Sequence, residues 1–202
     1  MVAKPQGFYQ RLQLLPLPAQ QAFMAALCER LLPNYALYEQ TSGHGDGHTL
    51  RTVLNLVWER LSVPNASIDF ARQAEKLAEC EPPEGDERFG ARRALDAVVS
   101  ISALLDTLQG ESPEAVLDVS RTSRAGVRAF IELTEGEVDA QALALIIRDH
   151  PLMEDENDFQ DAVLEAVSGP INKTTLKEIR TLGRNNGISN LGLTLDEEAG
   201  AE

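Results

Sequence analysis

Apolar residues recur at three- and four-residue spacing along most of this chain, as they do along the buried face of an amphipathic helix. The cleanest case follows Asp46, where apolar side chains stand at i, i+3, i+4, i+7, i+8 and i+11: Leu50, Val53, Leu54, Val57, Trp58 and Leu61. No stretch alternates between apolar and polar residues well enough to predict a strand, and no internal repeat is convincing. The pattern therefore predicts an all-α protein, a single-domain helical bundle of about eight helices joined by short loops.

Prolines, glycines and capping residues set the limits of the predicted helices. The expected helices cover residues 7–15, 18–42, a stretch after Asp46, 67–80, 88–109, 113–134, a stretch between Asp139 and His150, 151–168 and 175–187. Because Pro33 lacks an amide hydrogen and clashes with the turn before it, it is expected to kink its helix. Ser112 and Thr175 are expected to cap the helices that follow them. The domain should span residues 1–195, and residues 196–202 should form a disordered acidic tail.

The stretch 88–109 is the most apolar of the predicted helices. A helix that is apolar nearly all round belongs in the middle of a bundle, so this helix is expected to be central. Asp96 interrupts it, and an ionised carboxylate in such surroundings needs a partner. We therefore expect the Asp96 carboxylate to be buried and paired with Arg51 or Arg30, so that Asp96→Ala costs about 3–5 kcal/mol.

Composition narrows the classes of partner. The chain has 202 residues, with 18 Lys plus Arg against 32 Asp plus Glu, a formal net charge of −14. This charge repels phosphate backbones and anionic lipid surfaces, so neither nucleic acid nor a membrane is an expected partner. No apolar run approaches the ~20 residues of a membrane-spanning helix, and the N-terminus lacks an apolar leader with a cleavage site. The two cysteines suggest no disulfide framework, and the sequence favours an acidic cytoplasmic protein with reduced thiols.

A loop with glycine at every second position, Gly43 to Gly47, precedes the helix of Leu50. His44, Asp46 and His48 in and beside this loop have a spacing that permits metal binding, but no established zinc signature accompanies them. The glycines also suggest an anion cradle at the start of a helix, although no lysine and no preceding strand support it. The favoured interpretation is simpler: Asp46 caps the helix and the two histidines are exposed.

A set of polar residues in the first half of the chain is the best candidate for a ligand site. It comprises Glu29, Arg30, Tyr35, Asp46, Arg51, Glu59 and Asp96. Polar and charged groups that converge in a pocket can bind a small ligand or carry out acid–base chemistry. The favoured alternative is a structural ion pair that fixes the register of neighbouring helices.

Three further groups are weaker candidates. Cys28 sits among apolar neighbours, where cysteine usually packs as a small hydrophobe rather than as a nucleophile. The acids over residues 154–161 lack the glycine and the terminal glutamate of a calcium loop, and acids are common in the first turns of a helix. The arginines over 121–128 are expected to form a solvated face paired with local acids, the alternative being a docking patch for an acidic partner.

Several strings of residues resemble a known family. They are LCER-x-x-PNY at Leu27–Tyr35, G-x-GDG at Gly43–Gly47, R-x-x-L-x-L-x-WE at Arg51–Glu59, Ala94–Ala97 with Asp96, Ser120–Ser123, and SNLGL at Ser189–Leu193. Together they make the chain similar, over nearly its whole length, to the YjaG-like family of bacterial proteins, domain of unknown function 416. The resemblance implies an all-helical single domain and brings no activity with it. The histidines that flank the GDG turn depart from the family pattern, so the resemblance does not extend a metal role to this loop.

Two functional hypotheses follow from the sequence. The first is a non-catalytic binding or protein-interaction module that self-associates, as a homodimer for example, or binds a protein partner. The alternative is a small-ligand-binding protein or an enzyme that uses the polar set between the central helices. A deep pocket where Tyr35, Arg51, Glu59 and Asp96 converge would favour the alternative, and a broad exposed apolar patch would favour the first. No catalytic residue, metal or cofactor is predicted.

Overall fold

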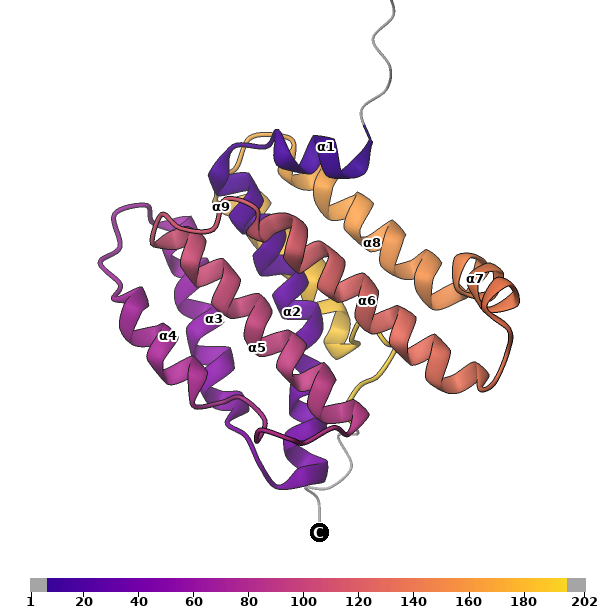
Figure 1. Ribbon diagram of the computed structural model, residues 1–202. Helices are drawn as coiled ribbons and strands as arrows, with labels where there is room; N and C mark the ends of the chain where they lie inside the picture. The colour runs from indigo at the N-terminus through magenta and orange to yellow at the C-terminus, as the bar shows by residue number, and fades with distance from the viewer. Residues whose placement is uncertain (1–6, 196–202) are drawn as a thin grey trace, which may run out of the picture.

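The computed structural model describes residues 7–195, which form nine α-helices and one short 3₁₀ turn with no strand among them (Figure 1). The helices are α1 (Phe8–Gln13), α2 (Leu17–Ser42), α3 (Gly47–Ser62), α4 (Phe70–Ala78), α5 (Phe89–Leu108), α6 (Ala115–Glu135), α7 (Ala140–Asp149), α8 (Pro151–Val167) and α9 (Lys173–Arg184), followed by η1 (Asn185–Gly187). The predicted all-α fold in a single domain is confirmed. The predicted tail over 196–202 lies outside the described residues.

The long helix α2 is the centre of the bundle. Figure 1 shows it enclosed by α5 and α6 in front, α3 to the left and α9 behind. Sixteen of its 26 residues are buried, and they occupy all sides of the helix. Pro33 lies inside α2, which continues to Ser42, so the helix predicted over 18–42 is present as one element. Helices α3, α5, α6, α8 and α9 therefore all pack against α2.

The expectation that residues 88–109 form the central helix is wrong. These residues form α5, whose Leu95 and Val99 side chains are exposed on the outer face. α2 looked less central in sequence because its buried positions include Glu29, Arg30 and Asn34. Charged and amide side chains can occupy the middle of a bundle when partners from other helices satisfy them, and sequence periodicity does not show such partners.

The loop between α2 and α3 has the predicted turn chemistry. Gly43 ends α2 in the left-handed conformation with φ +67°. Asp46 caps α3 by accepting a hydrogen bond from the Thr49 amide at 2.9 Å and another from the Thr49 hydroxyl at 2.7 Å. These two hydrogen bonds, from the hydroxyl first and then the amide, hold the pKa of the Asp46 carboxyl below its usual value. The predicted cap is thus confirmed.

Two other predicted caps are wrong. Ser112 caps nothing, because α6 begins only at Ala115 and Ser112 itself adopts a positive φ of +54°. Thr175 lies inside α9, whose actual cap is Asn172 three residues earlier. In both places the local sequence has the serine or threonine that is typical of a helix cap. The helix nevertheless begins at a different residue in the folded chain.

A buried turn follows η1 and ends the described chain. Ser189 closes it: its amide donates to the Leu193 carbonyl at 2.8 Å, and its hydroxyl accepts hydrogen bonds from the amides of Leu191 and Leu193. Ser189, Asn190 and Leu191 are all buried. The C-terminal turn therefore belongs to the core. Among residues 7–195, no helix is both long enough and apolar enough to cross a bilayer.

Candidate functional site

Glu29 is buried between α2, α3 and α9, with both carboxylate oxygens occupied. Its Oε1 accepts hydrogen bonds from the Trp58 indole Nε1 at 3.0 Å and from Arg180 Nε at 3.1 Å. Its Oε2 accepts one from Arg51 Nη1 at 2.5 Å and lies 3.5 Å from Arg184 Nε. Charge-assisted hydrogen bonds of this kind are the strong ones in proteins. We call Glu29 and these four partners the Glu29 cluster.

The Glu29 cluster has more positive than negative charge. Three guanidinium groups face one carboxylate, which leaves a net charge of +2 in a chain whose net charge is −14. Burial lowers the pKa of Arg180, and the nearby guanidiniums of Arg184 and Arg51 lower it further, while Glu29 raises it. The repulsion among the three arginines is therefore only partly relieved by Glu29.

The three arginine side chains also reach solvent. Their side chains are 37% (Arg51), 25% (Arg180) and 50% (Arg184) exposed, whereas that of Glu29 is completely buried. Each guanidinium has five N–H donors in a fixed fork, and Glu29 occupies only some of them. The excess charge is thus accessible from outside the protein.

Close packing of α9 against α2 brings two of these arginines to Glu29. Arg180 and Arg184 stand one turn apart on α9, on the same face. Gly183 lies between them, where a Cβ atom would sit 2.6 Å from the carbonyl oxygen of Ala26 on α2. Only glycine allows the two helices to approach so closely, and Ala26 is one turn before Glu29. The glycine therefore sets the position of α9 relative to the buried carboxylate.

A cavity of about 780 Å³ opens beside the Glu29 cluster. Arg51 is its basic wall, Tyr35 and Glu39 are its polar wall on α2, and η1 and the last described residues close the far side. Its apolar lining includes Leu32, Pro33, Ala36 and Leu195. A volume of this size is typical of a site for a small organic molecule, about 300–1,000 Å³.

The start of α3 borders the same cavity, but the chain's own carboxylates already occupy it. The Gly47 amide donates to both oxygens of Glu39, each at 3.2 Å. Tyr35 accepts a hydrogen bond from the Asp46 amide at 3.0 Å and donates to the Cys80 carbonyl at 2.7 Å. Burial raises the pKa of Tyr35 to about 12, so its hydroxyl stays protonated. An anion at this helix N-terminus would therefore meet acids, and Arg51 is the better point of attachment.

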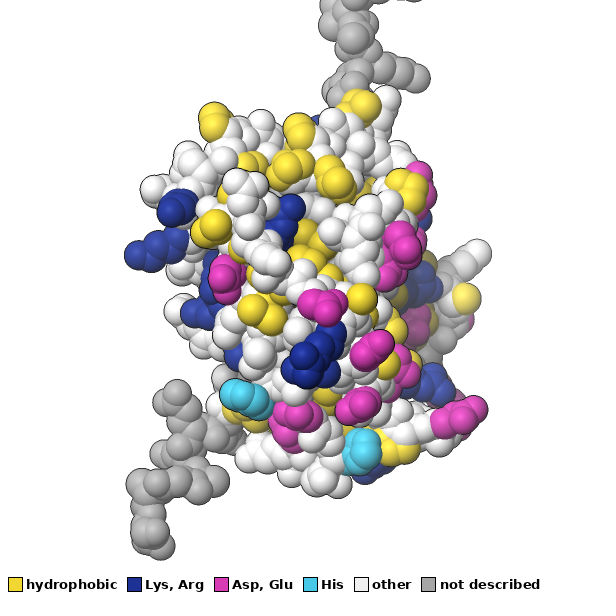
Figure 2. All heavy atoms as spheres, turned by 90° about the vertical axis from the view of Figure 1, so that its left-hand side faces the viewer, with side chains coloured by type: hydrophobic (Ala, Val, Ile, Leu, Met, Phe, Trp, Pro, Cys, Tyr) yellow, Lys and Arg dark blue, Asp and Glu magenta, His cyan; other side chains and the backbone are white. Residues whose placement is uncertain are grey.

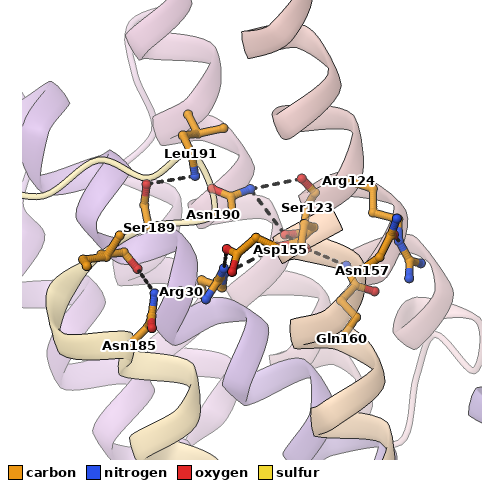
Figure 3. Close-up of polar contacts among 12 residues, drawn as sticks. Arg30, Ser123, Arg124, Asp155, Asn157, Gln160, Asn185, Ser189, Asn190 and Leu191 are labelled. Carbon is orange, nitrogen blue, oxygen red and sulfur yellow. Dashed lines mark hydrogen bonds and ion pairs between the residues drawn. The ribbon is translucent and has the colours of Figure 1, made fainter. Parts of the chain in front are cut away.

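Arg30, the next residue along α2, belongs to a second polar region between α2, α6 and α8 (Figure 3). Its side chain is 3% exposed. The guanidinium donates a hydrogen bond to Asp155 and lies 3.5 Å from the Glu156 carboxylate. It also stacks over the Phe159 ring, 4.2 Å from the ring centre. Arg30 is therefore enclosed by the acids and the aromatic ring of α8.

Glu156 is completely buried in this second region. Its Oε1 accepts hydrogen bonds from the Ser123 hydroxyl and from Gln160 Nε2, both at 2.6 Å. Burial raises the pKa of Glu156, while the hydrogen bonds from Ser123 and Gln160 and the charge of Arg30 work in the opposite direction. These partners therefore favour the ionised form of Glu156, which burial alone disfavours.

The C-terminal turn completes this region. Asn190 accepts a hydrogen bond from Asn34 of α2 at 2.8 Å and donates one to the Ser123 carbonyl of α6 at 3.0 Å. Figure 3 shows Asn190 and Ser123 pointing toward each other beside Arg30. We call Arg30, Glu156, Gln160, Ser123, Asn34 and Asn190 the Arg30 network. It ties α2, α6, α8 and the C-terminal turn together in the interior.

The predicted pairing of Asp96 with Arg51 or Arg30 is wrong. Asp96 pairs instead with Arg93 of its own helix, at 3.0 Å, and its side chain is half-buried beside Gly126 of α6. Burial raises the pKa of Asp96 to about 6, and the Arg93 charge opposes that rise. The pairing differs because acids of other helices engage both predicted arginines and because α5 is not the central helix.

The seven predicted ligand residues do not form one site. Glu29 and Arg51 meet in the Glu29 cluster, and Tyr35 borders the adjacent cavity with Asp46 bonded to its hydroxyl. Arg30 and Asp96 lie in or beside the Arg30 network, and Glu59 is an exposed residue of α3. Their roles in ligand binding stay predictions.

Other candidate chemistry is not supported by the positions of the residues. His44 and His48 are exposed, and residues 7–195 hold no group of three or more His, Cys, Asp or Glu side chains arranged to bind a metal ion. Cys28 and Cys80 are buried free thiols. Burial, and secondly the charge of Glu29, raise the pKa of Cys28, which opposes formation of a nucleophilic thiolate.

Comparison with known proteins places the chain in a family. The family model described as "Protein of unknown function (DUF416)" matches residues 7–194. The chain belongs to this family. The uncharacterised protein YjaG of Escherichia coli strain K12 is 35% identical over 191 residues, which cover 93% of this chain and 96% of that protein. An uncharacterised protein of Haemophilus influenzae is 31% identical, covering 92% and 95% of the two chains.

The fold also matches that of a DUF416 family protein whose crystal structure is known. A DUF416 family protein from Shewanella baltica OS155, solved at 1.91 Å resolution, superposes with a TM-score of 0.87 at 33% identity. The match covers 95% of this chain and all of that one. The family and its relatives carry no stated activity, so any function must be argued from the geometry of the site.

The segments that carry the family resemblance lie at the two polar regions. LCER-x-x-PNY supplies Glu29 to the Glu29 cluster and Arg30 and Asn34 to the Arg30 network. The third string supplies Arg51 and Trp58, and the last two supply Ser123 and Asn190. Arg180 and Arg184 were missed in the sequence, although their spacing on an amphipathic helix could have marked them as one face.

Proposed function

We propose that this DUF416 protein is a non-catalytic binding protein for a small organic anion. The ligand would place an acidic group against the exposed guanidiniums of Arg51 and Arg184, and its apolar part in the adjacent cavity. The observation that carries the proposal is the excess of three arginines over the single buried acid, Glu29.

Charge balance supports a ligand rather than a purely structural pair. One arginine would neutralise Glu29, and each additional guanidinium raises the repulsion within the cluster. An anion that binds there would relieve this repulsion and would occupy donors that Glu29 leaves open. The proposal follows the small-ligand alternative predicted from the sequence. Self-association, a protein partner and a cytoplasmic location stay predictions.

The form of the cavity supports an acid with an apolar body. Its walls combine one basic side chain, Arg51, with apolar side chains such as Leu32 and Ala36. The one acid among its described lining residues, Glu39, already accepts hydrogen bonds from the Gly47 amide. The arginine would fix the orientation of the ligand, and burial of its apolar part would add about 25 cal/mol per Å². The cluster offers charge and no activated nucleophile, so binding without covalent chemistry fits it best.

Titration with hexanoate, with hexanamide as the uncharged analogue, tests the proposal by calorimetry at low ionic strength. We expect saturable hexanoate binding and at least about tenfold weaker hexanamide binding, a difference of ~1.4 kcal/mol. Salt should weaken hexanoate binding, because the arginines are partly exposed. Equal binding of the two compounds, or no saturable hexanoate binding at all, would contradict the proposal.

Variants locate the binding. Arg51→Gln and Arg184→Gln should each weaken hexanoate binding about tenfold, the usual size for a charge-assisted hydrogen bond. Arg128→Gln is the matched control: this exposed arginine pairs with Glu132 on α6, away from the cluster. Its hexanoate affinity should equal that of the wild type, and circular dichroism should show all three variants folded.

A further inference from the structure

A second basic cavity lies between α3 and α9 and has Arg180 in its lining. It has a volume of about 280 Å³ and is lined by Asn55, Trp58 and Ser62 of α3 and by Lys173, Lys177 and Arg180 of α9. Glu59 is the one acid among its described lining residues, and it is exposed. Three cations and one acid give this cavity a net charge of +2.

The basic residues of α9 form one line. Lys173, Lys177, Arg180 and Arg184 stand at i, i+4, i+7 and i+11, which places them on one face of the helix. Figure 2 shows a corresponding concentration of Lys and Arg side chains along the left-hand edge of the face that α3 and α4 present, while most acidic side chains on that face lie in its centre and on its right-hand side. The line runs from the second cavity to the Glu29 cluster.

The two lysines differ from the arginines of α9 in their pairing. Neither Lys173 nor Lys177 forms an ion pair within residues 7–195. Both are exposed, so each keeps three N–H donors for a ligand. Lys173 and Lys177 stand one helical turn apart and both line the second cavity, where Glu59 is the one acid among the described lining residues.

Arg180 connects the two positive regions. Its Nε donates to Glu29 in the cluster, while its Nη2 donates to Asn55 at the second cavity. Its guanidinium also lies 5.7 Å from the centre of the Trp58 ring, which lines the same cavity. These contacts hold Arg180 in place, so the positive regions on its two sides have a fixed separation.

We infer that the ligand of this protein carries two separate anionic groups, carboxylate or phosphate, with the second bound by Lys173 and Lys177. The inference rests on the proposed function, because it assigns the first group to Arg51 and Arg184. Lysine ammonium groups act as point charges that suit such an anion, and the arginine forks suit the first one. Once one group is bound, the second binds at a high effective concentration when the linker spans the two regions.

A series of α,ω-dicarboxylates from adipate to dodecanedioate tests the inference by calorimetry, with hexanoate as the single-anion reference. Affinity should rise to a maximum at one chain length, at least about tenfold above hexanoate, and fall on either side. The double variant Lys173→Gln/Lys177→Gln should lose this gain and keep the hexanoate affinity. Lys76→Gln, which changes an exposed lysine of α4, is the matched control and should keep both.

The outcomes separate the inference from the proposed function. If hexanoate binds through Arg184 and no dicarboxylate binds more tightly, the second group has no site and the inference is wrong, while the proposed function stands. If the gain is present but survives in the lysine double variant, the assignment to Lys173 and Lys177 is wrong. If neither hexanoate nor any dicarboxylate binds, both are wrong.

Discussion

Glu29 and Arg30 are neighbours on α2, yet they belong to polar regions of opposite kinds. Glu29 is one buried acid surrounded by three arginines that reach solvent. Arg30 is one buried base enclosed by acids, amides and a serine from three other parts of the chain (Figure 3). The first region has excess charge that solvent can reach, whereas in the second Arg30 and Glu156 keep opposite charges together in the interior.

This contrast separates a binding region from a structural one. A buried ion pair that is enclosed and hydrogen-bonded fixes the arrangement of helices, and its members cannot meet a ligand without unfolding. A cluster whose unused N–H donors face solvent can fold without a ligand, and a bound anion would lower the repulsion among its cations. Burial of an ionisable residue alone does not mark a site, because Glu29 and Arg30 are equally buried.

The largest effect on stability is expected in the Arg30 network. Arg30→Met leaves Glu156 buried without its cation, which should lower the free energy of unfolding by about 3–5 kcal/mol. Arg184→Met is the matched control, and because its side chain is half exposed it should cost less than ~1 kcal/mol. Urea unfolding followed by circular dichroism measures both. Equal losses of unfolding free energy in the two variants would show that the Arg30 network is no more important for stability than the Glu29 cluster.

The second effect should appear in both stability and binding. Gly183→Ala places a methyl group 2.6 Å from the Ala26 carbonyl, so α9 must move away from α2 at a cost of about 1–3 kcal/mol. The shift should also weaken hexanoate binding, because it withdraws Arg180 and Arg184. Gly169→Ala, where the space is open, should keep the hexanoate affinity of the wild type. A stable Gly183→Ala variant with unchanged affinity would mean that the helix contact does not position the arginines.

A smaller effect is expected from Asp96 at the border of the Arg30 network. Its folded pKa of about 6 lies above the ordinary value of 3.8, so the folded state binds the proton more tightly than the unfolded state. The stabilisation from this proton is complete below pH 3.8 and is lost as the pH rises to 6. Over this interval the wild type should lose about 1–2 kcal/mol relative to Asp96→Asn, after allowance for partial exposure. Parallel pH profiles of unfolding free energy for the two proteins would rule out the raised pKa.

The smallest stability change is expected for Glu29→Gln, but it should raise anion affinity. The amide oxygen can still accept the Trp58 hydrogen bond, and the partly exposed guanidiniums can turn toward water, so the loss should be about 1 kcal/mol. Without the acid the cluster is more positive, and hexanoate should bind about three- to tenfold more tightly. Weaker hexanoate binding in this variant would show that Glu29 orients the arginines rather than competing with the ligand.

Most helices could be predicted because their signals are local. The apolar stripe of α3, the Asp46 cap and the left-handed Gly43 depend on residues within a few positions of one another. The prediction of a cap was wrong where a capping motif is present but the helix begins at another residue, as at Thr175. The place of α2 at the centre could not be predicted, because the partners that satisfy its polar residues come from distant helices.

The candidate site could be predicted only in part for the same reason. Glu29 and Arg51 were singled out and do meet, 22 positions apart in sequence. Arg180 lies 151 positions from Glu29, and nothing near either residue in sequence indicates that they touch. A similar distance in sequence hid the acidic partners of Arg30, whereas the partner of Asp96 is Arg93, only three positions away on the same helix. Sequence pattern identified polar residues that needed partners, and only the packing of helices could assign them.

The position of Arg30 on α2 also bears on how the protein is made. Its acidic partner Asp155 follows 125 residues later in the chain. At synthesis rates of about 5–20 residues per second, the nascent helix waits roughly 6–25 seconds for that partner to emerge. During this interval Arg30 must remain hydrated. The part of α2 around Arg30 therefore cannot be buried before α8 has been synthesised. The final packing of α2, the first long helix to be synthesised, therefore depends on the last third of the chain to be synthesised.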